Sequence, residues 1–140
     1  MAVEIRVLGA DDAHVLRRVA PGVFDYEVDE AAVREFLADE RHHIVVAVDD
    51  GVVVGFVSCM HYIHPDKPRP ELWLNEVAVA STHRRQGIAS ALLREAFALG
   101  RRLGCREAWV LTEPDNTPAL GLYASAGGER KEQVMFSFPL

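Results

Sequence analysis

One stretch of the sequence restricts the possible folds more than any other: an amphipathic helical pattern with a strand-like run on each side. Residues 87–103 carry apolar side chains at helical spacing, and the glycine that follows, Gly104, is typical of a helix end. The apolar positions are Ile88, Leu92, Ala96, Leu99 and Leu103. Residues 71–79 and 108–112 are rich in apolar side chains and read as strands. This unit predicts two parallel strands connected through the helix.

The rest of the chain predicts a mixed sheet with helices on both faces. A tight hairpin is expected at Asp49-Asp50-Gly51, between two β-branched-rich runs. The last helix is expected to begin with Thr117 as N-cap and Pro118 at its first position. The expected order is β-α-α-β-β-β-α-β-α-β, an α/β (α+β mixed sheet) fold. Its elements are residues 3–7, 9–19, 29–39, 43–48, 52–62, 71–79, 87–103, 108–112, 117–126 and 134–138.

Length, composition and charge narrow the class of protein. A chain of 140 residues fits a single domain over residues 1–140, and 49% hydrophobic with 26% charged residues is ordinary globular usage. A net charge of −6 argues against a nucleic-acid binder and favours cationic partners. The start, Met1 to Glu4, shows no leader pattern, and no apolar run reaches the ~18 residues of a membrane span. We expect a cytoplasmic protein without a membrane partner.

Neither the cysteines nor the adjacent histidines predict a metal site. Cys59 and Cys105 are isolated from each other, and His42-His43 has no partner at metal-ligand spacing. No metal and no disulfide framework are expected.

The most informative local sequence is the run Arg84-Arg85-Gln86-Gly87-Ile88-Ala89, between a predicted strand and the amphipathic helix. The first turn of a helix leaves backbone N–H groups unpaired and favours negative charge, so it can hold a pyrophosphate. Gly87 allows close approach, Ala89 keeps the next contact small, Ser90 adds a hydroxyl donor, and the arginines bring positive charge. The alternative is a solvated basic loop before an ordinary helix, which would be the better interpretation of these residues without their context.

Two longer runs around this loop resemble the GNAT superfamily of N-acetyltransferases. The second follows an Asn-x-x-Ala-x-x-Leu-Tyr-x-x-x-Gly pattern from Asn116 to Gly127. The first, similar to that family's coenzyme-A motif, is Asn75-Glu76-Val77-Ala78-Val79 followed by His83-Arg84-Arg85-Gln86-Gly87-Ile88-Ala89-Ser90-Ala91-Leu92-Leu93. The resemblance covers residues 71–128 closely, and it implies strands at 71–79 and 108–112 that splay around acetyl-coenzyme A. A departure is Gly128, where many members carry Phe.

A narrower resemblance concerns the subfamily. His61-Tyr62, the proline-rich loop and the strand from Glu71 to Glu76 look most like the aminoglycoside 3-N-acetyltransferases.

The family resemblance implies roles for particular residues. Tyr123 is the candidate general acid, because a phenol can return a proton to a departing sulfur. Glu76 is the candidate general base, and we expect its apolar neighbours to desolvate it and raise its pKa; Glu113 and Asp115 are the reserves. The expected acetyl-coenzyme A contacts are Val77, Ala78, Val79, Arg84, Arg85, Gln86, Gly87, Ile88, Ala89, Ser90, Asn116 and Tyr123.

Acidic residues between positions 25 and 40 suggest where a cationic amine would bind. Asp25, Tyr26, Glu27 and Glu113 are the candidate acceptor-binding residues. The predicted function is therefore transfer of an acetyl group to an amine of a small cation, resembling an aminoglycoside or a polyamine. Protein lysine or N-terminal acetylation, and a coenzyme-A-binding module without catalysis, remain as alternatives. A homodimer is possible because the strand at 134–138 could pair across a two-fold axis.

Overall fold

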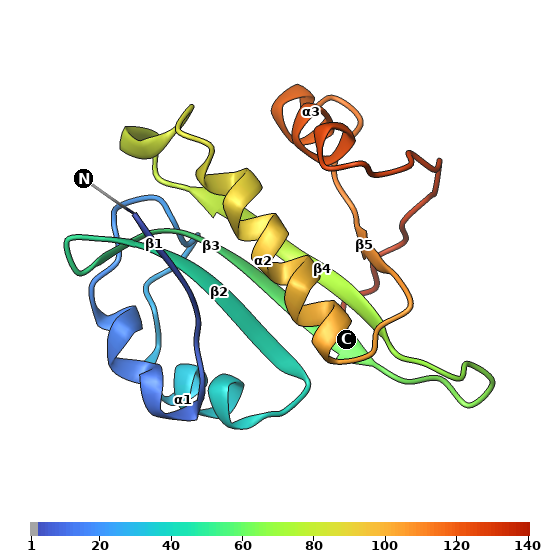
Figure 1. Cartoon of the computed structure of the whole chain (residues 1–140), viewed down its shortest axis with the longest axis horizontal. Helices are drawn as coiled ribbons and strands as arrows, with labels where there is room; N and C mark the ends of the chain where they lie inside the picture. Colours follow the sequence, from blue (N-terminus) through green and yellow to red (C-terminus); the bar gives the residue numbers. More distant parts are fainter. Residues whose placement is uncertain (1–2) are drawn as a thin grey trace.

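The computed structural model describes residues 3–140. Met1 and Ala2, the first two residues of the segment Met1 to Glu4 in which no leader pattern was found, lie outside the described residues. Two short 3₁₀-helices, η1 and η2, accompany three α-helices and five strands (Figure 1). In chain order these are β1 (Glu4–Val7), η1 (Ala10–Arg17), α1 (Glu30–Ala38), β2 (His42–Asp49), β3 (Val52–Tyr62), β4 (Glu71–Val79), η2 (Ser81–His83), α2 (Ile88–Arg102), β5 (Ala108–Val110) and α3 (Thr117–Ser125).

The strands form one mixed sheet in the order β1-β2-β3-β4-β5. The first three pairings are antiparallel, and β4 pairs with β5 in parallel, from Leu72 opposite Ala108 to Leu74 opposite Val110. The parallel pair with α2 between its strands confirms the predicted strand–helix–strand unit. No helix in residues 3–140 is both long and apolar enough to cross a bilayer.

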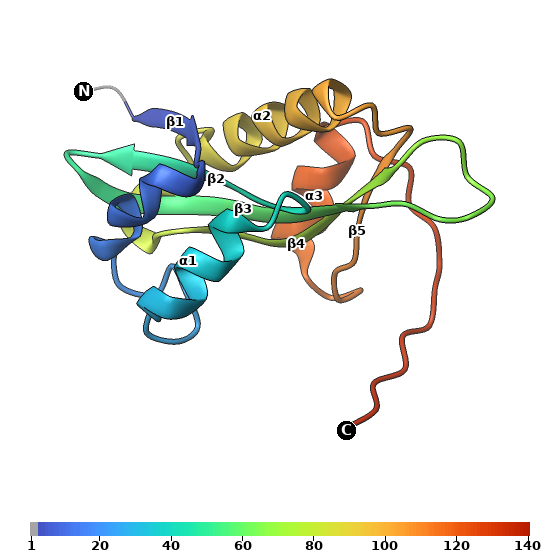
Figure 2. The same ribbon diagram turned by 90° about the horizontal axis from the view of Figure 1, so that it is seen from below.

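Helices cover both faces of the sheet, as predicted, with α2 on one face and α1 on the other (Figure 2). The α2 side is packed closely: a Cβ added to Gly55 on β3 would lie 3.4 Å from Leu92 of α2. On the other face, Phe24 stacks on Phe56 with ring centroids 4.3 Å apart. The two faces bury apolar side chains from every layer, which fixes the sheet between the helices.

A β-bulge in β4 determines which way its side chains point. Ser58 pairs with Glu76 and Cys59 with Leu74, so Asn75 is the extra residue. Because side chains alternate along a strand, one extra residue exchanges the faces of everything after it. Leu72 and Leu74 before the bulge, and Val77 and Val79 after it, therefore face α2, whereas Glu76 lies on the opposite face.

The first and the last helical segments differ locally from what the sequence predicts. The segment after Gly9 forms the 3₁₀-helix η1 in place of an α-helix, and Asp12 accepts the Gly9 N–H at 2.7 Å. The N-cap of α3 is Asn116 in place of Thr117; its Oδ1 accepts the Ala119 N–H at 3.2 Å, and Pro118 falls at the second helical position. Asn is among the residues most favoured at an N-cap, because its side-chain oxygen can accept a backbone N–H of the first turn.

The strand expected at residues 134–138 is absent from the described chain. Strands are stabilised by pairing with a neighbouring strand. The edge strand β5 ends at Val110, two residues earlier than the expected residue 112. The segment has no paired strand within its own chain.

Candidate active site

A gap opens where β4 and β5 separate. The two strands pair only as far as Leu74 and Val110, while β4 continues alongside β3 to Val79. Ala80 donates its N–H to Val54 of β3 at 2.7 Å. Because N–H directions alternate along a strand, the N–H groups of Val77 and Val79 point away from β3, into the gap that β5 has left.

The β-bulge at Asn75 is the reason that the N–H groups of Val77 and Val79 point into the gap. Before it, Leu72 donates its N–H to Glu107 on the β5 side at 3.0 Å. Without an extra residue, the even-numbered N–H groups would keep pointing to that side, and those of Val77 and Val79 would face β3. The side chain of Ala78, also expected at the cofactor, faces away from α2.

The N-terminus of α2 lies at the end of this gap and has no side-chain cap. Gly87 is the N-cap with φ +75°, and Arg85 is also left-handed at φ +63°. A Cβ added at Gly87 would meet no atom within 4 Å. The unpaired N–H groups of the first turn therefore border open space, which is the arrangement that binds phosphate oxygens.

The residues around this N-terminus divide into buried anchors and exposed polar groups. Ile88 is buried, so only its backbone can reach a ligand, while Ala89 and Ser90 are half-buried. Arg84, Arg85 and Gln86 are exposed, and neither arginine forms an ion pair within residues 3–140. Their charge is available to an anion.

A contact that the sequence did not suggest holds the loop before α2. His83 Nε2 lies 2.6 Å from Asp49 Oδ2, at the β2–β3 hairpin, and both side chains are largely buried. The second carboxylate oxygen, Asp49 Oδ1, is buried without a hydrogen-bond partner within the described chain. The residues lie 34 positions apart, and no local pattern joins them.

Tyr123 lines a cavity of 360 Å³ between α2, β5 and the end of α3. Leu74 and Val110, the last paired residues before the strands separate, line the same cavity. Burial raises the pKa of Tyr123 above its usual value, so its phenol carries a proton at neutral pH. Asn116 is exposed, and its side-chain oxygen is engaged in capping α3, so its NH₂ group is the part left for a ligand.

Glu76 does not have the environment expected for it. The sequence suggested that apolar neighbours would desolvate this carboxylate, but its side chain is exposed. The bulge is the reason, because it turns Glu76 away from the face on which Leu72 and Leu74 are buried. Glu76 therefore lies on the face of β4 opposite to Leu74, the residue that lines the 360 Å³ cavity together with Tyr123.

A second cavity, of 540 Å³, lies on the same face as Glu76 and is formed by η1, α1 and the loop between them. Asp25, Tyr26 and Glu27 line it, whereas Glu113 does not. Tyr26 is 88% exposed, and neither Asp25 nor Glu27 forms an ion pair in the described part of the chain. Glu30, also in the lining, is paired with Arg17 at 2.7 Å.

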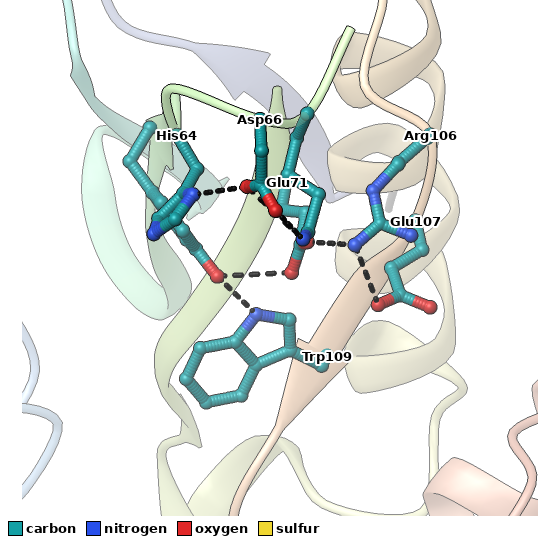
Figure 3. A network of polar contacts seen from close by, with 8 residues as sticks. His64, Asp66, Glu71, Arg106, Glu107 and Trp109 are labelled. Atoms are coloured by element: carbon teal, nitrogen blue, oxygen red, sulfur yellow. Dashed lines mark hydrogen bonds and ion pairs between the residues drawn. The ribbon is translucent and has the colours of Figure 1, made fainter. Parts of the chain in front are cut away.

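A polar network joins β3, β4 and the start of β5 at the end of the β4–β5 pairing that lies opposite to the gap (Figure 3). Tyr62 donates to Glu71 Oε1 at 3.0 Å and accepts from Trp109 Nε1 at 2.9 Å, while Arg106 pairs with the other oxygen of Glu71. The Tyr62 hydrogen bond and the Arg106 charge hold the pKa of Glu71 below its usual value. Trp73 stacks beside Trp109, with ring centroids 5.9 Å apart. Tyr62 and Glu71 both belong to the segment that suggested the subfamily, but no local pattern in the sequence predicts that their side chains meet.

Comparison with known proteins agrees with this geometry. Residues 13–127 match the sequence model of the acetyltransferase (GNAT) family. An aminoglycoside N(6′)-acetyltransferase type 1 of Salmonella typhimurium is 32% identical over 105 residues, which cover 73% of this chain and 72% of that protein. Human N-acetyltransferase 8 is 32% identical over 103 residues, covering 74% of this chain and 45% of that protein.

Solved structures show the same fold. An aminoglycoside acetyltransferase from an uncultured soil metagenomic sample superposes with a TM-score of 0.86 at 24% identity, covering 100% of this chain and 99% of that one. The aminoglycoside N-acetyltransferase AAC(6′)-Iy in complex with CoA has a TM-score of 0.77 at 26% identity, covering 99% and 95%. The Salmonella relative is named as an N(6′)-acetyltransferase, and AAC(6′)-Iy is a further 6′ enzyme, so the expected resemblance to the 3-N subfamily is corrected.

Proposed function

The chain belongs to the acetyltransferase (GNAT) family, and from that premise we propose that it transfers the acetyl group of acetyl-CoA to a primary amine of a small cationic acceptor. The observation that supports this most is the gap between β4 and β5. The uncapped N-terminus of α2 lies at its end, and free backbone N–H groups line its side.

The cosubstrate would enter from the α2 side. Its pyrophosphate suits the first turn of α2, with Arg84 and Arg85 supplying charge, and its pantetheine arm suits the gap along Val77 to Val79. The solved relative at 26% identity is a complex with CoA, which supports this cosubstrate. Asn116 offers its NH₂ group to an amide carbonyl of the arm.

The proposed reaction is direct transfer. The nitrogen of a neutral amine attacks the thioester carbonyl carbon, the carbon–sulfur bond breaks, and an N-acetylated product and the CoA thiol result. The N–H groups of Val77 and Val79 are oriented to donate to the carbonyl oxygen as negative charge develops there, an effect worth ~3 kcal/mol for one donor. Glu76 takes the proton from the amine, directly or through water, and Tyr123 donates one to the departing sulfur.

The two faces of the sheet separate these roles. Glu76 lies on the face that carries the 540 Å³ cavity, so the acceptor side holds the base. Tyr123 lies beside α2, so the cosubstrate side holds the acid. In this arrangement the amine attacks the carbonyl carbon from one side of the gap, and the sulfur departs on the other side.

The acceptor class is proposed from charge and size. Asp25 and Glu27 bring unpaired negative charge to a cavity within the usual range for small-molecule sites. The Salmonella relative is named as acting on aminoglycosides, which supports a polycationic amine. Proteins remain the alternative acceptor class, and the peptides in the assay panel test this alternative.

The test is a thiol-release assay with acetyl-CoA and a panel of aminoglycosides, polyamines, amino acids and peptides. We expect turnover with a polycation and a raised KM for that polycation in Asp25→Asn and Glu27→Gln, but not in Glu35→Gln, an exposed acidic residue of α1 outside the cavity. Turnover of peptides alone would overturn the acceptor class. Calorimetric binding of acetyl-CoA without turnover of any amine would indicate a binding module in place of an enzyme.

A further inference from the structure

The 360 Å³ cavity that Tyr123 lines extends well beyond that residue. Its lining reaches from Tyr123 on α3 to Cys105, which follows the far end of α2. Figure 1 shows α2 running along β4, with β5 beside it. The sheet contributes two facing pairs to the lining, Leu72 with Ala108 and Leu74 with Val110. The proposed reaction uses only the Tyr123 end of this space.

Most of the cavity has an apolar or small lining. Phe97 and Gly100 come from α2, and Cys105 follows that helix. The charged side chains of the lining, which include Arg101 and Arg106, belong to the last turn of α2 and to its connection with β5, and so lie away from Tyr123. The part nearer to Tyr123 therefore suits a slender apolar group, since ligand sites of this kind are lined mainly by apolar side chains.

The cavity begins at the closed end of the gap, where Leu74 and Val110 form the last pair before β4 and β5 separate. Leu74 faces α2, and Val110 faces the same way because residues paired across a sheet share a face. The cosubstrate would run from the N-terminus of α2 along the gap toward this closed end. The part of the cosubstrate nearest to the cavity is then its acyl group.

The geometry of the proposed reaction gives the acyl group the same direction. In the transition state the carbonyl carbon has four neighbours. Its oxygen points to the N–H groups of β4, its sulfur lies on the side of Tyr123, and the amine arrives from the face of Glu76. The alkyl group takes the fourth direction, toward Leu74 and Val110. The alkyl group of acetyl is a single methyl, which fills little of 360 Å³.

We propose that this cavity is an acyl-chain site, and that the protein accepts acyl-CoA donors whose unbranched chains are longer than acetyl. The inference rests on the proposed function, because that function supplies the position of the thioester. The chain lies between α2 and β5, against Phe97, Leu72 and Ala108. The carbon–sulfur bond breaks and the carbon–nitrogen bond forms as before, so the amine receives the longer acyl group and the CoA thiol is released.

The size of the cavity sets the expected chain length. From Val110 to Ala108 the cavity follows β5 for about 7 Å, at ~3.3 Å per residue, which leaves room for several methylene groups. A fully buried methylene tightens binding by about fourfold, and a gain of roughly two- to fourfold is expected here because Ala108 is exposed. The gain should end where the chain reaches Arg101 and Arg106, because apolar atoms there would displace water from charged groups.

Calorimetric titration without amine tests the site, using CoA and its acetyl, butanoyl, hexanoyl and decanoyl thioesters. We expect the dissociation constant to fall from acetyl to hexanoyl by roughly two- to fourfold per added carbon, and to fall no further for decanoyl. Ala108→Leu places a larger side chain in the cavity at an exposed position. It should raise the ratio of the hexanoyl-CoA constant to the CoA constant by at least about tenfold.

Ala124→Leu is the matched control, because Ala124 is exposed on α3 and lies outside the cavity lining. That variant should leave the ratio unchanged. With an amine that the protein acetylates, hexanoyl-CoA should give a kcat/KM within about tenfold of that for acetyl-CoA. Weaker binding of hexanoyl-CoA than of acetyl-CoA, or the same gain with chain length in the wild type and in Ala108→Leu, would overturn the acyl-chain site alone. Failure to bind CoA and acetyl-CoA would overturn the proposed function with it.

Discussion

The backbone N–H of Gly128 donates a hydrogen bond to the carbonyl oxygen of Tyr123 at 2.9 Å, so the chain that ends α3 is tied to the proposed proton donor. Gly127, at φ +90°, donates to Ala124 at 3.0 Å, which completes a Schellman motif. Gly128 has no side chain, which permits this close approach to Tyr123. A Cβ there would lie 2.9 Å from the Tyr123 oxygen.

Gly128→Ala should therefore destabilise the protein by roughly 1 kcal/mol, because either the Schellman hydrogen bond or the end of α3 must shift. Gly121→Ala is the matched control in the same helix, since its added Cβ meets nothing within 4 Å. That change should stabilise by about 0.5–1 kcal/mol through helix propensity. Urea unfolding of both variants measures the difference, and equal effects would contradict the close contact at Gly128.

The pair formed by His83 and Asp49 should position the loop before α2. His83→Ala and Asp49→Asn should each raise the dissociation constant for acetyl-CoA several-fold, because the N-terminus of α2 is then less well placed. The double variant should be no worse than either single one, so the coupling energy should equal the effect of one single variant, about 0.5–1 kcal/mol. Calorimetric titration checks this, and fully additive effects would show that the two residues act separately.

Arg84→Ala should weaken acetyl-CoA binding by about tenfold, since a charged contact to phosphate is lost while the backbone N–H groups remain. The remaining affinity should also depend less on salt. Arg94→Ala removes an exposed charge further along α2 and serves as the control. If the two variants bind equally at low salt, Arg84 does not contact the phosphates.

Acid should destabilise the fold through His43. Burial, followed by the charges of His61 and His42, lowers the pKa of His43 to about 4, and its Nε2 lies 2.7 Å from His61 Nδ1. In the unfolded chain a histidine titrates near 6.5, so the unfolded state binds more protons between these values. Stability is thus complete above about pH 6.5 and falls as the pH is lowered toward 4.

Because the ring is only partly shielded, we expect a loss of about 1–2 kcal/mol between pH 7 and pH 5 rather than the full effect of the shift. His43→Gln should reduce this loss, whereas His64→Gln, at an exposed loop position, should not. Urea midpoints at the two pH values provide the measurement. Identical pH dependence in the wild type and His43→Gln would contradict the assignment.

Much of the fold was predictable because its strongest signals are local. The apolar spacing after Gly87 located α2, and the Asp-Asp-Gly turn located the β2–β3 hairpin. The bulge also has a signal that the sequence analysis missed. Apolar residues occupy even positions at Leu72 and Leu74, and odd positions at Val77 and Val79. A change of parity within one strand indicates an extra residue.

Other features depend on contacts that no local pattern encodes. His83 reaches Asp49, and Arg106 reaches Glu71, only because the sheet brings distant segments together. The exposure of Glu76 follows from the bulge rather than from its neighbours in sequence. The strand pattern at residues 134–138 was read correctly as a pattern, but a strand also needs a partner, which one copy of the chain does not provide.

Tyr123→Phe isolates proton donation to the departing sulfur, because it removes one hydroxyl and keeps the ring that lines the 360 Å³ cavity. The single-turnover rate of acetyl transfer, at saturating acetyl-CoA and amine, reports the chemical step alone. We predict that this rate falls by roughly 10²–10⁴-fold, the usual contribution of a general acid, while the calorimetric dissociation constant for acetyl-CoA stays within about twofold. A single-turnover rate within about twofold of the wild type would contradict the account, as would a loss confined to acetyl-CoA affinity.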